Sequence, residues 1–78
     1  MSSDGSTLDR LGIGETSTVE SVDGDPAITQ RLLEMGLTPG TKVHVVRFAP
    51  LGDPMEVRVR GYNLSIRKQD ARNVRLRK

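Results

Sequence analysis

Residues 42–60 read KVHVVRFAPLGDPMEVRVR, a pattern of two strand-like runs separated by a short loop. The second run, from Met55 to Arg60, alternates apolar and charged residues at every position, as a strand with one buried face does. Loop 49–54 contains two prolines, which cannot donate hydrogen bonds to a sheet, and a glycine that tolerates a positive φ. The stretch therefore predicts a β-hairpin with a proline-containing loop at its end.

The first run, 42–48, changes its facing midway. Val43 and Val45 share one face of a regular strand, whereas Val46 and Phe48 share the other. A β-bulge near Val46 would explain this change, because a bulge inserts one residue and resets the alternation. Bulges also bend strands, so that a few short strands can curl into a barrel.

The clearest helix signals lie between residues 25 and 36. Asp25 is a good N-cap, Pro26 fits the first helical position, and Gly36 suits the left-handed residue after a helix. Apolar residues recur with helical spacing on one face, namely Ile28, Leu32 and Met35. We therefore expect one helix that packs on the sheet.

Two further leucines lie near the end of this helix. Leu37 directly follows Gly36 and is placed to fold back on Leu32, as the apolar contact of a Schellman ending does. Leu33 points away from the apolar face at 100° per residue, so it lies at the edge of the core or is exposed. An exposed Leu33 would be a candidate contact residue for a partner.

The rest of the chain supplies weaker signals of regular structure. These are a strand at about 16–22, a second hairpin turn at Gly61-Tyr62, a strand at 63–67, a polar segment at 68–73 and a last strand at 74–77. Residues 1–7 carry no periodic apolar residues and are expected to form a disordered tail. Residues 8–78 are expected to form one mainly β domain, a small SH3-like barrel of about five strands with one short α-helix inserted between the first and second strands.

The charge of the chain is distributed unevenly. Residues 1–40 carry seven acidic and two basic side chains, a net charge of −5, whereas residues 41–78 carry ten basic and three acidic side chains, a net charge of +7. Such asymmetry can steer docking to a partner, or it can hold the two halves of a barrel together. No apolar run approaches the roughly 20 residues that cross a bilayer, so we expect a soluble, cytosolic protein without direct membrane insertion.

The sequence contains no recognisable catalytic or metal-binding set. It has no cysteine, and His44 is its one histidine, so a transition-metal site cannot be completed by these residue types. Asp25 and Asp53 are explained by helix capping and by turn chemistry. No motif pairs a nucleophile with a base, and no Gly-rich loop precedes a helix. We expect no catalytic residue, no metal site and no cofactor, and we expect His44 to face outward from its strand.

Three segments, in order, resemble one known family. They are LLEMGLTPGT at 32–41, APLGDP at 49–54 and VRVRGYNLSIR at 57–67. Together they resemble the FeoA family, ferrous iron transport protein A, over a region from about Leu8 to Leu76. The resemblance implies an SH3-like barrel in the cytoplasm, held at the inner face of the membrane through its partner.

The same resemblance implies a non-catalytic accessory or regulatory role in bacterial ferrous iron uptake. The implied partner is FeoB, the membrane transporter of ferrous iron that carries a GTPase domain, and the implied action is binding rather than chemistry. The resemblance does not assign the surface that meets the transporter.

Candidate contact residues are predicted from the composition of the loop and of the helix end, without reference to the family. Loops that contain prolines expose side chains at low entropic cost, which suits a docking site. The alternative is a tight hairpin connection in which Leu51 folds onto the barrel. The candidates in the loop and at the helix end are Leu33, Gly36, Leu37, Pro50, Leu51 and Pro54.

A second function class is a basic SH3-like barrel that binds nucleic acid. Its positive surface would consist of Arg58, Arg60, Arg67, Lys68, Arg72, Arg75, Arg77 and Lys78. Tyr62 and Phe48 are the two aromatic residues of the chain, and Phe48 is expected in the core, so few rings remain for base stacking. Because outward charges on alternating strands usually form a solvated face, binding to nucleic acid is the weaker hypothesis.

Overall fold

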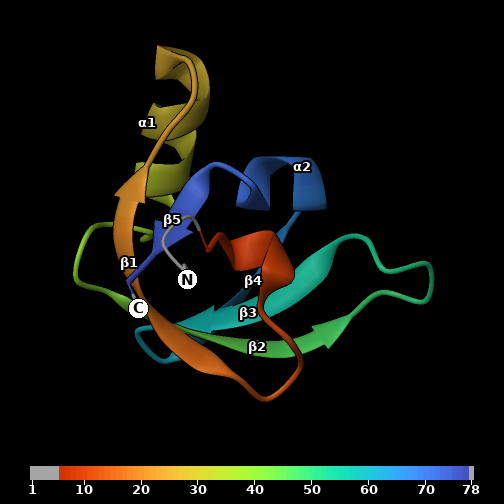
Figure 1. Ribbon diagram of the computed structural model, residues 1–78. Coiled ribbons are helices and arrows are strands. Elements are labelled where there is room, and N and C mark those ends of the chain that lie inside the picture. The colour runs from red at the N-terminus through yellow and green to blue at the C-terminus, as the bar shows by residue number, and fades with distance from the viewer. Residues whose placement is uncertain (1–5, 78) are drawn as a thin grey trace.

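The computed structural model describes residues 6–77 of the chain, and Figure 1 shows a mainly β domain. Its elements in order are the 3-10 helix η1 (Leu8–Arg10), β1 (Thr16–Val22), α1 (Pro26–Glu34), β2 (Lys42–Phe48), β3 (Met55–Val59), β4 (Tyr62–Ile66), α2 (Lys68–Ala71) and β5 (Val74–Leu76). The predicted helix between the first two strands is confirmed. The polar segment after β4 forms one helical turn, α2.

The five strands form one antiparallel sheet in the order β4-β3-β2-β1-β5. Figure 1 shows that this sheet is curled rather than flat, with β1 passing from the β2–β3 layer to the part that carries β5. Its inner face encloses a single core. Alternate residues of β3, namely Met55, Val57 and Val59, belong to this core. The predicted barrel-like arrangement is confirmed.

The β-bulge predicted near Val46 is confirmed. The register between β2 and β3 shifts between Val45, which pairs with Val57, and Arg47, which pairs with Glu56. Because Val46 is the extra residue, Val45 before it and Phe48 after it can both pack against the core. A second irregularity lies between Val19 and Ser21, where β1 pairs with β5. The alternation of β1 was too weak to predict it.

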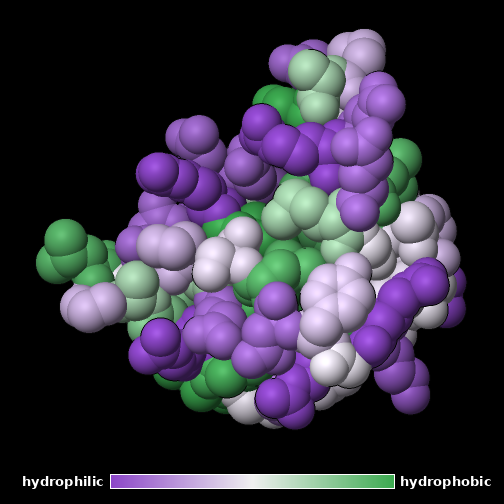
Figure 2. All heavy atoms as spheres, turned by 180° about the vertical axis from the view of Figure 1, so that it is seen from behind, coloured by the Kyte–Doolittle hydropathy of each residue, from purple (hydrophilic) through white to green (hydrophobic). Residues whose placement is uncertain are grey.

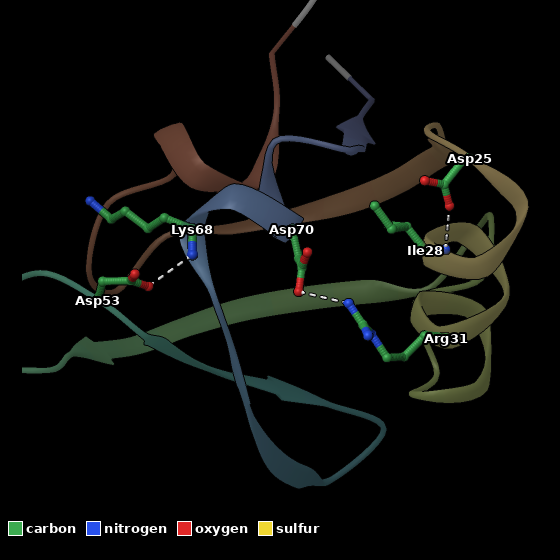
Figure 3. Close-up of polar contacts among 6 residues, drawn as sticks. All are labelled: Asp25, Ile28, Arg31, Asp53, Lys68 and Asp70. Atoms are coloured by element: carbon green, nitrogen blue, oxygen red, sulfur yellow. Dashed lines mark hydrogen bonds and ion pairs between the residues drawn. The ribbon is translucent and has the colours of Figure 1, made fainter.

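The ends of α1 follow the signals in the sequence. The Asp25 carboxylate accepts a hydrogen bond from the Ile28 amide at 3.1 Å (Figure 3). At the other end, the Leu37 amide donates to Leu32 O at 3.2 Å and the Gly36 amide donates to Leu33 O at 3.0 Å. Gly36 has φ of +104°, so the helix ends in a Schellman motif as predicted.

The turn between β3 and β4 lies one residue earlier than predicted. Val59 pairs with Tyr62, so the two central residues are Arg60 and Gly61 rather than Gly61 and Tyr62. Their φ values are +50° and +88°, and positive φ at both positions is the signature of a type I′ turn. The prediction is wrong because it expected glycine at the first central position, where arginine stands.

Residues 6 and 7, which precede η1, are paired with the sheet. The Leu76 amide donates to Ser6 O at 3.0 Å, and Thr7 forms an isolated bridge with Arg75, so Ser6 and Thr7 pair with β5 instead of belonging to a disordered tail. The edge of β5 offers unpaired backbone groups, which explains this pairing. The remainder of the predicted tail, 1–5, lies outside the described residues.

Candidate partner-binding surfaces

The loop between β2 and β3 ends in an exposed apolar side chain. The Ala49 amide donates to Pro54 O at 2.9 Å and the Gly52 amide donates to Ala49 O at 2.7 Å, which closes the loop. Leu51 stands at the end of this closed loop and is 97% exposed. Figure 2 shows a hydrophobic projection that stands clear of the body there. Leu51 therefore points into solvent and does not fold onto the barrel. Pro50 and Leu51 are called the loop tip below, whereas the predicted contact residue Pro54 lies at the base of the loop, where its carbonyl accepts from Ala49.

The base of the same loop is fastened to α2. The Asp53 carboxylate accepts a hydrogen bond from the Lys68 amide at 2.9 Å (Figure 3). The Lys68 ammonium lies 4.8 Å from the centre of the Phe48 ring. The N-cap residue of α2, Arg67, makes no capping hydrogen bond with its own side chain. Asp53 therefore caps a helix from another element, rather than its own turn as the sequence suggested.

A second polar contact joins α2 to α1. The Arg31 guanidinium lies 3.3 Å from the Asp70 carboxylate, and Figure 3 shows the two side chains reaching toward one another. Loop 49–54, α2 and α1 are thus connected through successive contacts. The loop tip projects from a fixed base.

The second candidate region lies at the end of α1 and is called the helix-end corner (Leu33, Gly36 and Tyr62). Leu33 is 38% exposed and Tyr62 is 47% exposed. The Tyr62 hydroxyl donates to Met35 O at 2.8 Å and closes over Gly36. A Cβ atom on Gly36 would lie 2.6 Å from the Tyr62 oxygen, so glycine is needed there for close approach as well as for its positive φ.

Leu37 does not belong to this surface. Its side chain is 0% exposed and packs in the core, because the Schellman motif folds the chain back over Leu32. The prediction that Leu37 contacts a partner is wrong for this reason. Tyr62 takes its place as an exposed apolar group; the sequence marked it only as an aromatic residue, and its contact with Gly36 depends on the fold.

The loop tip and the helix-end corner do not lie together. In Figure 1 the β2–β3 loop projects to one side of the molecule, and α1 stands at the top on the opposite side. The predicted contact residues therefore form two separate surfaces. A partner must either span the domain or use one of them.

The outer face of β2, β3 and β4 carries a polar network around Glu56. Its carboxylate accepts from Arg47 Nε at 2.8 Å and from Asn63 Nδ2 at 2.9 Å. The hydrogen bond from Arg47 has the larger effect and the one from Asn63 the smaller, and both hold the pKa of Glu56 below its ordinary value. On the neighbouring strand, His44 Nδ1 lies 2.8 Å from the Thr16 hydroxyl.

The predicted nucleic-acid surface is partly occupied by internal contacts. Arg75 pairs with Asp23 at 2.7 Å, and Arg58 donates to Asn63 at 3.0 Å. Phe48 packs against the core and lies under the Lys68 ammonium, which leaves Tyr62, 47% exposed, as the one aromatic ring of the chain that is open to stacking. Lys78 of the predicted set lies outside the described residues.

Residues 6–77 offer neither a metal-binding cluster nor a membrane-spanning helix. No group of three or more histidine, aspartate or glutamate side chains in this range could hold a metal ion. Neither α-helix in the described part of the chain has the length and apolar character needed to cross a bilayer.

A curled five-stranded sheet with a helix inserted after its first strand defines the chain as a small SH3-like domain. The FeoA domain model matches residues 6–78, and the chain belongs to the FeoA family. The family is involved in ferrous iron transport, and the resemblance of the three sequence segments is confirmed.

Three relatives illustrate the match. The FeoA protein of Chlorobium tepidum is 41% identical, with a TM-score of 0.83 over 91% of this chain and 68% of that one. The FeoA of Stenotrophomonas maltophilia, complexed with zinc, is 32% identical, with a TM-score of 0.80 over 92% of this chain and 89% of that one. It is described as an SH3 domain protein and as a candidate activating factor of ferrous iron transport.

The third relative is a longer protein. The Fe(2+) transport protein A/Fe(2+) transporter FeoB fusion protein of Porphyromonas gingivalis is 37% identical over 67 residues, which are 86% of this chain. This chain spans 8% of the length of that fusion protein.

Proposed function

We propose that this protein is a non-catalytic accessory protein of ferrous iron uptake that binds the transporter FeoB at the cytoplasmic face of the membrane. The observation that supports this proposal is the relative in which a FeoA domain and FeoB belong to one polypeptide. A covalent link keeps two domains at high effective concentration. Separate chains that work together need a binding surface instead.

The exposed apolar side chains support a function in binding. Leu51 at the loop tip is fully presented to solvent on a loop whose base is fastened, so little conformational entropy is lost when it is buried by a partner. Leu33 and Tyr62 offer a second apolar surface beside Gly36. We expect FeoB to contact the loop tip, the helix-end corner, or both.

The test is direct binding of the purified protein to full-length FeoB in detergent. Biolayer interferometry at low salt should give a saturable signal with a Kd on the order of 1 μM, a binding free energy of about −8 kcal/mol. A chain unfolded by an internal core substitution, Val57→Asp, serves as the control for non-specific adsorption. Absence of saturable binding by the folded protein would contradict the proposal.

A further inference from the structure

A shallow, open pocket lies beside the helix-end corner. It has a volume of about 400 Å³, and its lining residues are Pro39, Gly40, Thr41, Lys42 and Arg60. The turn after α1 forms one wall and the β3–β4 turn forms the other. Both charged residues of the lining are cationic. An open hollow of this kind suits a side chain that protrudes from another protein.

Arg60 is held over this pocket in an uncommon backbone conformation. Its φ of +50° lies in the left-handed region, where asparagine and glycine are the favoured residues of a type I′ turn. Its Nη2 atom donates to the hydroxyls of Thr38 and Thr41, at 3.1 Å each, and these hydroxyls lie 2.9 Å apart. Unfavourable local geometry that is maintained by more distant contacts marks a candidate functional position.

The two cations of the pocket are not neutralised from within. Among residues 6–77, the ion pairs are Arg31 with Asp70, Arg47 with Glu56 and Arg75 with Asp23. Lys42 and Arg60 therefore have no carboxylate partner in the described part of the chain. The Arg60 contacts with threonine use one terminal nitrogen, and a guanidinium has further N–H donors in a planar fork that matches a carboxylate.

The backbone of the pocket distinguishes among anions. Phosphate sites commonly use a cradle of free backbone amides. Here the Gly40 amide donates to Val19 O at 2.8 Å and the Thr41 amide donates to Thr38 O at 3.0 Å, so both are occupied. Since the Gly40 and Thr41 amides are not free for a phosphate cradle, the anion contacts of this pocket would come from the Lys42 and Arg60 side chains, which suits a carboxylate.

We propose that this pocket binds a carboxylate side chain of FeoB, while apolar residues next to that carboxylate pack on Leu33 and Tyr62. The inference rests on the proposed function and adds the site and its chemistry. Charge complementarity supports an acidic segment as the occupant, because residues 41–78 carry a net charge of +7 and the pocket itself contains two unpaired cations. Tyr62 contacts Met35 O and Arg60 contacts the Thr38 and Thr41 hydroxyls, so the apolar and cationic parts both lie along segment 35–41.

The test compares FeoB binding by the double variant Lys42→Gln/Arg60→Asn with binding by Arg72→Gln. Asparagine keeps the left-handed turn and removes the guanidinium, and Arg72 is an exposed cation outside the pocket. We expect the double variant to raise the Kd by about tenfold or more, and Arg72→Gln to change it by less than about twofold. Thermal unfolding followed by circular dichroism verifies that both variants are folded.

The possible outcomes separate the two proposals. If folded wild-type protein and the double variant bind FeoB equally well, the pocket inference is overturned and the proposed function stands. If wild-type protein does not bind FeoB, the proposed function is overturned together with this choice of partner.

A second experiment measures ligand binding to the pocket in the absence of FeoB. NMR titration with a capped Asp-Leu-Asp peptide should shift the resonances of residues 39–42 and 60–62, and inorganic phosphate should shift them less at equal concentration. A larger, saturable response to phosphate, or no localised response to the peptide, would overturn the assignment of a carboxylate.

Discussion

At the scale of single residues, the position of the Tyr62 hydroxyl depends on the absence of a side chain at Gly36. Gly36 requires a positive φ to end α1, and its missing Cβ leaves room for the Tyr62 hydroxyl to reach Met35 O. Two separate physical demands therefore meet at one glycine. The helix end and the start of β4 cannot be varied independently.

The first prediction concerns the cost of a side chain at Gly36. Gly36→Ala should destabilise the fold by more than Gly52→Ala, because both glycines have positive φ but the added Cβ meets nothing within 4 Å at Gly52. Positive φ costs about 1–2 kcal/mol at either position, and Gly36→Ala adds the clash and a lost hydrogen bond. Urea unfolding measures both variants.

A double variant identifies the cause of that difference. In a Tyr62→Phe background the oxygen that the Cβ would meet is absent, so the cost of Gly36→Ala should fall toward that of Gly52→Ala. Equal costs of Gly36→Ala in the two backgrounds would show that the hydroxyl is not responsible.

The second prediction concerns Leu51. Leu51→Ser should leave the free energy of unfolding within about 0.5 kcal/mol of wild type, since the side chain is almost fully exposed. Affinity for FeoB should fall severalfold if the loop tip is a contact surface. Ile13→Ser is the matched control, because Ile13 is 62% exposed on another loop. An equal loss in both variants, or no loss at Leu51, would contradict a contact at the loop tip.

At the scale of elements, α2 depends on the loop that precedes β3. A helix of four residues cannot be stable alone, and its first amide is satisfied by Asp53 from a distant turn. Arg31 reaches the same helix from α1. That exposed ion pair contributes little to stability, so the cap is the stronger of the two contacts.

The third prediction tests this cap. Asp53→Ala should destabilise the protein by about 1 kcal/mol and speed hydrogen exchange at the Lys68 amide, because that donor loses its acceptor. Asp53→Asn retains an acceptor oxygen and should cost less. Unchanged exchange at Lys68 in Asp53→Ala would show that the contact does not stabilise α2.

The fourth prediction concerns the strands around Glu56. Since hydrogen bonds from Arg47 and Asn63 lower the pKa of Glu56 in the folded state, the ionised carboxylate stabilises the fold. This stability is present above the ordinary pKa of about 4.5 and is lost as pH falls through the lower, folded-state pKa. The difference in unfolding free energy between wild type and Glu56→Gln should therefore shrink as pH falls below about 4.5. A difference that does not change between neutral and acidic pH would contradict the lowered pKa.

At the scale of the whole molecule, local signals predicted most of the fold. The caps of α1, the bulge at Val46 and the family segments all depend on residues close in sequence, and each was confirmed. The arginine in the type I′ turn could not be predicted in this way. Arg60 is held there by Thr38 and Thr41, about twenty residues earlier, and no local rule contains that contact.

The candidate site was predicted less completely than the fold. Exposure of Leu33 could be read from helical spacing, since its direction differs from that of Leu32. Burial of Leu37 and the contact between Gly36 and Tyr62 depend on how the helix end meets β4. Hollows between turns that are distant in sequence, such as the pocket beside Arg60, have no sequence signature at all.

The ion pairs of residues 6–77 do not neutralise the charge difference between the two halves of the chain. One ion pair between the halves, Arg75 with Asp23, follows the asymmetry, whereas Arg31 with Asp70 runs against it. The excess positive charge of residues 41–78 therefore remains available to attract a partner. Electrostatic attraction acts mainly on the rate of association.

The last prediction follows from that excess. Raising NaCl from about 50 to about 500 mM shortens the Debye length from roughly 14 to 4 Å, so the association rate constant with FeoB should fall by about tenfold or more. The dissociation rate constant should change less, because contacts of apolar side chains are not screened by salt. Leu51→Ser should show the opposite division, with faster dissociation and nearly unchanged association. An association rate that does not depend on salt would mean that the charge asymmetry of this chain does not guide it to the transporter.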